Sequence, residues 1–195
     1  SRSNNKSTSV FGQLRWKITP DLELAGGARY THDKKQTTLL VIQNNLATAT
    51  GRTSYPEGVP LPISYSNNNV SPDVTLTWKP SSNQTIYAGY KTGYKAGGIS
   101  NPAVTAVSMT AANLSFGPEK VKGFEAGYKA DLFANTVRFD IVGYRYNYNG
   151  LQVSSYDSIR VAYSIRNAAK ARTYGIASSF QWLVTDRFTL DGNIG

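Results

Sequence analysis

The feature that most constrains this chain is a set of segments in which apolar residues recur at every second position. Val10, Leu14 and Trp16 alternate with polar side chains, and LELAGGARYTHD repeats the pattern after a break at 19–21. A period of two places apolar side chains on one face of a strand and polar side chains on the other. The pattern recurs along the chain and predicts about eight strands in four hairpins.

The breaks between these segments alternate strictly in length. Short breaks fall at 19–21, 80–83, 134–135 and 184–187, and long polar connections fall at about 33–70, 96–117 and 149–163. One tight rim and one rim of extended loops are typical of an up-and-down membrane barrel. The predicted fold is therefore all-β, an antiparallel up-and-down transmembrane β-barrel. Beyond Ile141 the alternation changes phase at Tyr144, Tyr146 and Tyr148, which requires a bulge or a change of environment.

Aromatic residues gather toward both ends of the predicted strands. Those near the short breaks are Trp16, Trp78, Phe133 and Trp182, and those toward the long connections include Tyr30, Tyr90, Tyr94 and Tyr144 to Tyr148. Two aromatic girdles at the two membrane interfaces are expected of an outer-membrane barrel. We therefore predict Trp16, Trp78, Tyr90, Phe133 and Trp182 as membrane-interface aromatics.

Composition excludes several classes of function. The chain of 195 residues has no cysteine and a single histidine, so it lacks the ligands of a thiolate or histidine metal centre. We expect no metal site, no cofactor and no enzymatic activity. The net charge of +9 comes from cations scattered singly along the chain, which argues against nucleic-acid binding. No apolar run approaches the ~20 residues of a membrane-spanning helix, and the opening SRSNNKSTS has no apolar core of a signal peptide.

The stretch YAGYKTGYKAGG at 87–98 could be read as a phosphate-binding loop. Its glycines match neither of the nucleotide-binding spacings, and no helical pattern follows that would present its N-terminus to a phosphate. It reads instead as a strand that leaves the membrane, with Gly97 and Gly98 at the bend into a long loop.

Five segments in order resemble the barrel of a TonB-dependent outer-membrane receptor, the family that imports ferric siderophores and related scarce nutrients. They are FGQLRWKITPDLELAGGARYTHDKK (11–35), VSPDVTLTWKPSSNQTIYAGYKTGYKAGG (70–98), FGPEKVKGFEAGYKADL (116–132), FDIVGYRYNYNGLQV (139–153) and NAAKARTYGI (167–176). Where the family commonly has a glycine, an aliphatic residue and a glutamate, this chain has Gly175, Ile176 and Ala177.

The resemblance implies a larger molecule in the bacterial outer membrane. Transporters of this type have about 22 strands around a plugged lumen, so we expect residues 1–195 to be a segment of the barrel domain, with plug domain, TonB box and signal peptide absent. The implied partners are outer-membrane lipid and lipopolysaccharide, a ferric siderophore or similar ligand, and TonB through the absent plug. No nucleic-acid partner is expected.

Polar side chains on the strand face predicted to point into the lumen are the candidate ligand-path residues, because a low-dielectric wall focuses their electric field on an anionic ligand. The predicted inward residues are Arg29, Lys91, Glu125, Lys129 and Arg172, and the predicted rim residues are Tyr94 and Lys95. The alternative role for the inward set is contact with the plug or with water in the lumen.

Two other functions stay open from the sequence. Eight strands can close into a small complete outer-membrane barrel with a structural or adhesive role. That reading requires the first and last strands to pair. A soluble secreted β-sandwich that binds an acidic glycan is the other, and solubility without detergent as a folded monomer would support it.

Overall fold

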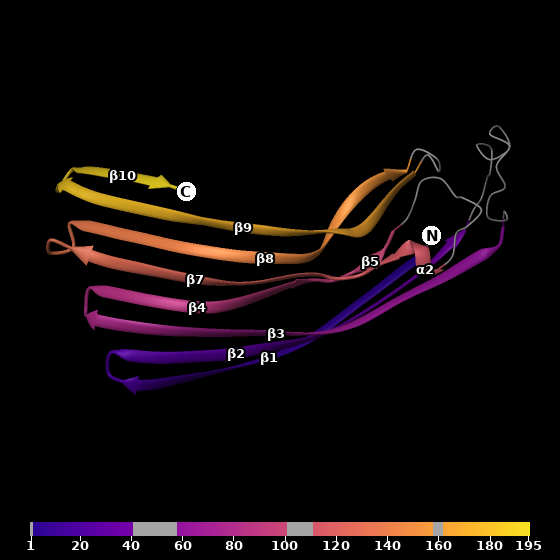
Figure 1. The fold of residues 1–195 in the computed structure, drawn as a ribbon, viewed down its shortest axis with the longest axis horizontal. Helices are drawn as coiled ribbons and strands as arrows, with labels where there is room; N and C mark the ends of the chain where they lie inside the picture. The colour runs from indigo at the N-terminus through magenta and orange to yellow at the C-terminus, as the bar shows by residue number, and fades with distance from the viewer. Residues whose placement is uncertain (1, 41–57, 101–110, 158–161) are drawn as a thin grey trace.

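The computed structural model describes residues 2–40, 58–100, 111–157 and 162–195 (Figure 1). Its elements are β1 (Arg2–Thr19), β2 (Leu22–Leu40), β3 (Pro60–Ser81), β4 (Gln84–Lys95), β5 (Gly98–Ile99), α2 (Ala111–Leu114), β6 (Ser115–Phe116), β7 (Glu119–Leu132), β8 (Val137–Asp157), β9 (Ala162–Thr185) and β10 (Phe188–Ile194). Within these ranges no helix has the length and apolar character needed to cross a membrane.

The long strands form one antiparallel sheet in the order β1-β2-β3-β4-β7-β8-β9-β10. This confirms the predicted eight strands in four hairpins, and Figure 1 shows the four tight turns together at one end of the sheet. The order is up-and-down, so each long strand pairs with its neighbour along the chain. Among the described residues β1 and β10 are the two edges and do not pair with each other, so the sheet is an open part of a barrel. It is neither a small closed barrel nor a sandwich.

The long connections are much shorter than predicted, because strands extend into them. β2 continues to Leu40 and β3 begins at Pro60, while β8 continues to Asp157 and β9 begins at Ala162. In the 96–117 connection the described residues form β5, α2 and β6. The prediction of loops over 33–70 and 149–163 is therefore wrong at the flanks of each range. Toward these outer ends the alternation of apolar residues does not continue, and the buried apolar residues of β2 and β3, Leu39 and Ile63, lie on the opposite face. The sequence therefore does not reveal that backbone pairing continues.

Register divides the sheet into an apolar face and a polar face. On the apolar face Leu22 lies opposite Trp78, Leu24 opposite Leu76 and Tyr30 opposite Val70. The last apolar row before the outer, long-hairpin ends is Val10, Tyr30 and Val70 on β1–β3, and Tyr90, Phe124 and Tyr174 on β4–β9. We call the apolar residues from the tight turns to this row the apolar band. Its side chains are strongly exposed, Leu14 to 82%, so nothing in the described chain covers this face.

The phase change on β8 comes from a change of environment. β7 and β8 pair without a register shift from Leu132 and Val137 to Lys120 and Asn149, so no bulge intervenes there. The three tyrosines therefore lie on the polar face, not in an aromatic girdle on the apolar face. Two of them pair across strands with a glycine or an acid: Tyr144 lies opposite Gly175 and Glu125, and Tyr146 lies opposite Gly123. Tyr148 lies opposite Val121 and Ala171.

Glycines on the polar face make room for tyrosine rings. A Cβ on Gly127 would lie 2.6 Å from ring atoms of Tyr87, its cross-strand partner, and a Cβ on Gly175 would lie 2.8 Å from the Tyr144 hydroxyl. Real Cβ contacts are longer than this, so a methyl group at either position displaces the ring. On the polar face, tyrosine rings therefore pack over glycines on the neighbouring strand as cross-strand pairs.

A compact apolar cluster lies at the outer end of the sheet. Ile63 is 2% exposed and packs with Leu39 and Leu114, with Leu61 and Ile99 at the margin. These side chains come from β3, β2, α2 and β5, and Figure 1 shows α2 and β5 beside the outer ends of β2 and β3. The segment that follows β4 is thereby folded onto the polar-face side of the β2–β3 hairpin.

The Tyr87–Gly127 pair makes a prediction about stability. Gly127→Ala should lower the free energy of unfolding by about 1–3 kcal/mol, because the methyl group overpacks against Tyr87. Gly143→Ala is the matched control, since a Cβ there meets no atom within 4 Å, and it should change stability by less than ~0.5 kcal/mol. Urea unfolding of the full-length protein folded into lipid vesicles measures both. Equal effects of the two substitutions would contradict the packing argument.

Candidate functional site

The pairing between β3 and β4 stops early, and this creates the candidate site. The last pair toward the outer end is Val74 with Tyr90, although both strands continue beyond it. Pro72 lies two residues further on and has no N–H to donate. Its carbonyl oxygen accepts a hydrogen bond of 2.7 Å from Thr92 Oγ1, so the β4 side of Pro72 is the side that lacks the donor. A proline at this position therefore ends the ladder, and the outer ends of β3 and β4 separate.

A polar cavity of about 520 Å³ opens on the polar face at this separation, and we call it the rim cavity. It is lined by Ser7, Ser9, Arg29, Thr31, Asp33, Ser71, Asp73, Thr92, Gly93, Tyr94 and Ala96. The lining combines one guanidinium, two carboxylates and several hydroxyls from four elements. The guanidinium and hydroxyls can donate to ligand oxygen atoms, and the carboxylates can contact a cationic group, so the cavity suits an oxygen-rich ligand with charge of either sign.

Tyr94 spans the separation and ties β4 to both neighbouring strands. Its hydroxyl donates to Asp33 Oδ2 at 2.8 Å and accepts from Asn67 Nδ2 at 3.0 Å. Asp33, on β2, is only 4% exposed. Burial, and then the hydrogen bond to Asp33, raise the pKa of Tyr94 far above its usual value, so the phenol remains a donor at neutral pH. Asp33 and Asn67 lie beyond the apolar band, so the cluster lies on the outer side of it.

Arg29 forms the cationic wall of the rim cavity. It lies on the polar face opposite Phe11 and Ser71. Its guanidinium lies 5.2 Å from the centroid of the Phe11 ring, and Nη1 donates to Ser9 Oγ at 3.3 Å. No carboxylate of the described residues forms an ion pair with it, so its charge is directed at the cavity. The aromatic contact orients the guanidinium without neutralising it.

Contacts of Gly97 with the Tyr65 hydroxyl and with the backbone of Phe116 fix the start of the segment after β4. The Gly97 N–H donates to the Tyr65 hydroxyl at 3.1 Å, and burial raises the pKa of that hydroxyl. A Cβ on Gly97 would lie 2.3 Å from the Phe116 carbonyl oxygen, so only glycine fits there. The predicted bend at Gly97 and Gly98 is thus a point of close backbone approach.

The remaining predicted site residues lie outside the lining of the rim cavity. Lys91 is on the polar face of β4 opposite Gly123, and the exposed Lys95 lies 3.9 Å from Glu119 Oε2. Glu125 accepts from the Tyr146 hydroxyl at 2.8 Å. Lys129 pairs with Asp140 at 3.3 Å, nearer the tight turns. The structure therefore brings together Arg29 and Tyr94 and leaves the other five apart from them.

Arg172 lies on the other face from the one predicted. Continuous register places it with Tyr174 and Ile176 on the face of the apolar band, opposite Asn147. Its Nε donates to Asn147 Oδ1 at 3.0 Å. The prediction that Arg172 points inward with Arg29 is wrong, because the sequence alone did not define the phase of β9.

The predicted interface aromatics divide by position. Trp16, Trp78 and Trp182 all lie on the apolar face near tight turns. Phe133 lies within the turn itself, at a positive φ of 52°. Tyr90 lies further from the turn, with its ring centroid 5.1 Å from that of Phe124. Their contact with a membrane interface stays a prediction.

Asn167 holds the base of the segment between β4 and β7, a role that the sequence did not show. Its Nδ2 donates to the carbonyl oxygens of Gly150 and Gly117 at 2.7 and 3.0 Å, and the Gly117 N–H donates to its Oδ1. Gln152 adds donations from Nε2 to Ala96 O at 2.9 Å and to Gly117 O at 3.2 Å. Gly150 has a φ of +66° at an irregularity in the β8–β9 register. The only signal in the sequence is that Asn167 opens the segment NAAKARTYGI.

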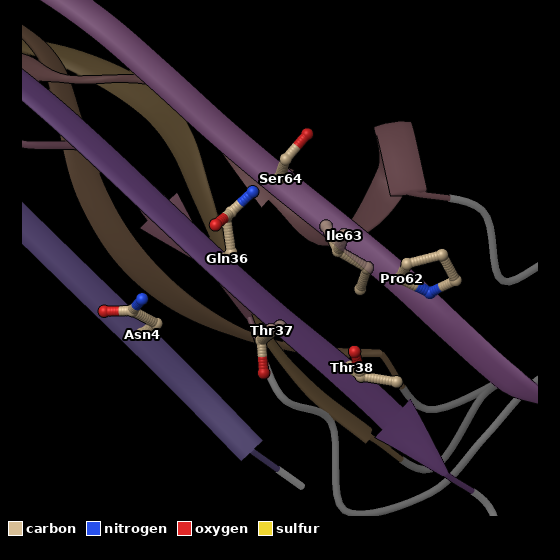
Figure 2. A pocket seen from close by; sticks show the side chains of 7 residues that line it. All are labelled: Asn4, Gln36, Thr37, Thr38, Pro62, Ile63 and Ser64. Atoms are coloured by element: carbon tan, nitrogen blue, oxygen red, sulfur yellow. The ribbon is translucent and has the colours of Figure 1, made fainter.

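A second cavity of about 580 Å³ lies between the outer ends of β1, β2 and β3. Figure 2 shows its lining, which consists of Asn4, Gln36, Thr37, Thr38, Pro62, Ile63 and Ser64. It contains no ionisable side chain, so it offers a ligand hydrogen bonds but no charge. The rim cavity is therefore the stronger candidate site.

An open up-and-down sheet with one apolar and one polar face, tight turns at one end and long hairpins at the other, defines part of the wall of a β-barrel membrane protein. The family model described as TonB dependent receptor-like, beta-barrel matches residues 1–195, and the chain belongs to this family. Barrels of this family are bacterial outer-membrane proteins. No curated protein sequence matched the chain.

Solved structures show the same fold at low sequence identity. The chain is similar to the ferric yersiniabactin uptake receptor FyuA from Yersinia pestis, with a TM-score of 0.75 and 18% identity over 98% of this chain and 26% of that one. It is also similar to the copper transporter OprC (0.71, 16%, 98% and 28%) and to the siderophore receptor PiuA from Acinetobacter baumannii (0.66, 19%, 98% and 26%). The chain spans about a quarter of the length of these structures.

The Tyr94 cluster predicts a local loss of stability on substitution. Tyr94→Phe removes the donor to Asp33 and leaves a buried carboxylate without its phenol, which should cost about 1–3 kcal/mol. Hydrogen exchange of the full-length protein should show faster exchange of backbone amides at the outer ends of β3 and β4. Tyr30→Phe is the control, since it loses one hydrogen bond to Asn68 in an exposed setting. Unchanged exchange in Tyr94→Phe would contradict the bridging role.

The Asn167 contacts predict a distinction between two substitutions. Asn167→Asp keeps the acceptor for Gly117 N–H but replaces donors with oxygen, which repels the carbonyls of Gly117, Pro118 and Gly150. It should therefore increase proteolytic cleavage of the 96–117 segment at least as much as Asn167→Ala. Asn193→Asp on β10 makes the same change of charge without these contacts. Cleavage of Asn167→Asp at the rate of the unsubstituted protein would refute the assignment.

Proposed function

We propose that this chain is part of the barrel wall of a transporter in the bacterial outer membrane that imports a ferric siderophore or a similar scarce nutrient. Family membership and the solved structures support a transporter or receptor as the class. The names of those structures include siderophore receptors and a copper transporter, so the supported cargo is a metal or its chelate. The apolar band contacts lipid and the polar face borders the lumen.

The observation that carries the proposal is the position of the rim cavity. It lies on the polar face at the outer edge of the apolar band, with Asp33 and Tyr94 beyond the last apolar row and Arg29 just inside it. A ligand entering from outside the cell reaches the lumen at this level. Arg29 supplies an oriented cation that no described carboxylate neutralises, while Asp33 and Tyr94 hold the strands around the opening. An anionic or oxygen-rich chelate would bind there through Arg29 and the hydroxyl groups.

The other polar-face charges have supporting roles in this proposal. Lys91 and Glu125 lie deeper along the ligand path, and Lys95 lies at the rim with Glu119. Lys129 is held by Asp140 near the tight turns, where the lumen would meet the plug. Coupling to TonB passes through that plug. Arg172 is not part of the path because it lies on the outward face.

Substitution of Arg29 in the full-length protein tests the proposal. With a panel of iron and copper chelates as probes, Arg29→Ala should weaken binding of the transported chelate by about tenfold or more, because a charge-assisted hydrogen bond is worth roughly 1.5–3 kcal/mol. Arg15→Ala is the matched control, since Arg15 lies on the polar face of β1 near the tight turn and outside the cavity. Fluorescence quenching on titration with each chelate measures both affinities.

Two outcomes would overturn parts of the proposal. If no chelate in the panel binds or supports growth of cells that depend on this protein, the assigned cargo class is wrong. If a chelate is bound and imported but Arg29→Ala and Arg15→Ala bind it equally, the rim cavity is not on the ligand path. Uptake that persists after removal of TonB would contradict the coupling.

A further inference from the structure

The outward face of β7, β8 and β9 carries a cluster of cations in the last row of the apolar band and just beyond it. Arg145 lies in the last aromatic row, directly between Phe124 on β7 and Tyr174 on β9. The next row outward contains Lys122, Asn147 and Arg172 side by side, and the row after it contains Lys120 and Asn149. All four cations are exposed. We call Lys120, Lys122, Arg145 and Arg172 the cation ladder.

The ladder is compact because the four residues share one face of three adjacent strands. Residues directly opposite on paired strands have Cβ atoms about 5 Å apart, and successive residues on one face of a strand are roughly 7 Å apart. The four charges are therefore concentrated in a patch of three rows by three strands. Such concentration of like charge is unfavourable unless an anion lies between the side chains.

No acidic side chain of the described residues neutralises this patch. Its rows contain only lysine, arginine, asparagine and aromatic side chains on this face. Glu119 and Glu125, the acids of β7 at this level, alternate onto the opposite face. The three ion pairs of the described chain join Lys95 to Glu119, Lys129 to Asp140 and Arg138 to Asp131, so none involves the ladder.

The surface below the ladder indicates what kind of anion fits. Phe124, Tyr174 and Ile176 of the apolar band are 66%, 76% and 66% exposed and lie directly beneath the cations. A ligand that covers both surfaces has a phosphate-bearing head next to an apolar tail. Aromatic residues mark the level of lipid headgroups, and clusters of lysine and arginine at that level bind anionic lipids. Free phosphate would satisfy the charges and leave the apolar surface uncovered.

We propose that the cation ladder is a binding site for the phosphate groups of lipopolysaccharide, whose acyl chains lie on the apolar surface beneath it. Arg145 and Arg172 can each hold a phosphate in a bidentate manner, and Arg172 is oriented for this by Asn147. Lys122 and Lys120 extend the site away from the membrane. The site rests on the outer-membrane location proposed above and is independent of the transported cargo.

Titration of the full-length protein in nonionic detergent with fluorescent lipopolysaccharide tests the site. The quadruple variant Lys120→Gln, Lys122→Gln, Arg145→Gln and Arg172→Gln should bind more than about a hundredfold more weakly, since each basic residue near a lipid headgroup contributes roughly fivefold. A variant that exchanges Lys and Arg at the same four positions should retain binding within about threefold, because the charges remain. Dephosphorylated lipopolysaccharide should bind the unsubstituted protein as weakly as the quadruple variant binds the phosphorylated form.

A second quadruple variant controls for net charge. Arg15→Gln, Lys17→Gln, Lys79→Gln and Arg187→Gln remove four cations near the tight turns and should leave the affinity unchanged. Electrophoretic mobility of unheated samples verifies that each variant is folded. If the ladder quadruple does not fold, Lys122→Gln and Arg172→Gln are measured singly, and each should bind about fivefold more weakly.

Several results would overturn the site. They are equal binding by the ladder quadruple and the unsubstituted protein, equal binding of phosphorylated and dephosphorylated lipopolysaccharide, and displacement of lipopolysaccharide by millimolar inorganic phosphate alone. The last would identify a free anion as the occupant. Binding of the chelate panel to the ladder quadruple separates the two proposals. Unchanged chelate binding together with lost lipopolysaccharide binding supports the cation ladder as the lipid site. Absence of chelate binding in every variant contradicts only the proposed cargo.

Discussion

The backbone hydrogen-bond ladder is the constraint on which the structure depends. A strand that crosses hydrocarbon must satisfy its N–H and C=O groups against its neighbours, since no water is available there. Seven consecutive strand pairs meet this requirement from β1 to β10. The ladder between β3 and β4 stops only beyond Tyr90, at the outer end of the band, where Pro72 has no donor and Thr92 supplies a side-chain hydroxyl to its carbonyl. The rim cavity exists because the ladder is interrupted at a level where water can satisfy the remaining groups.

Sequence reasoning succeeded where one face of a strand must differ from the other. The tight turns and the hairpin order followed from alternation around Trp16, Trp78 and Trp182, because lipid and lumen demand opposite side chains. It failed at the outer ends of β2, β3, β8 and β9, where the strands continue but the alternation of the apolar band does not. It also failed for the tyrosines of β8, because Tyr144 and Tyr146 are explained by glycines and an acid on other strands, such as Gly175 opposite Tyr144.

The candidate site shows the same limit. Arg29 and Tyr94 could be selected from the sequence by residue type and by position near a strand end. Asp33 could not, since it lies 61 residues from Tyr94 and meets it only because β3 and β4 separate. Arg172 was assigned to the wrong face because the face of each residue is counted by alternation along the chain. One extra or missing residue between Ile141 and Tyr174 reverses the assignment of every residue that follows. Register between strands, not composition within them, determines which charges act together.

The base formed by Asn167, Gln152 and Gly117 has a consequence for how such a protein diversifies. Its hydrogen bonds join β8 and β9 to the two ends of the segment between β4 and β7 and use no residue from 101–110. Changes of length within a surface connection cost little when its ends are already held together. The connection can therefore gain, lose or exchange residues while its point of attachment stays in place. New ligand preferences could thus evolve in the connection without a new barrel wall beneath it.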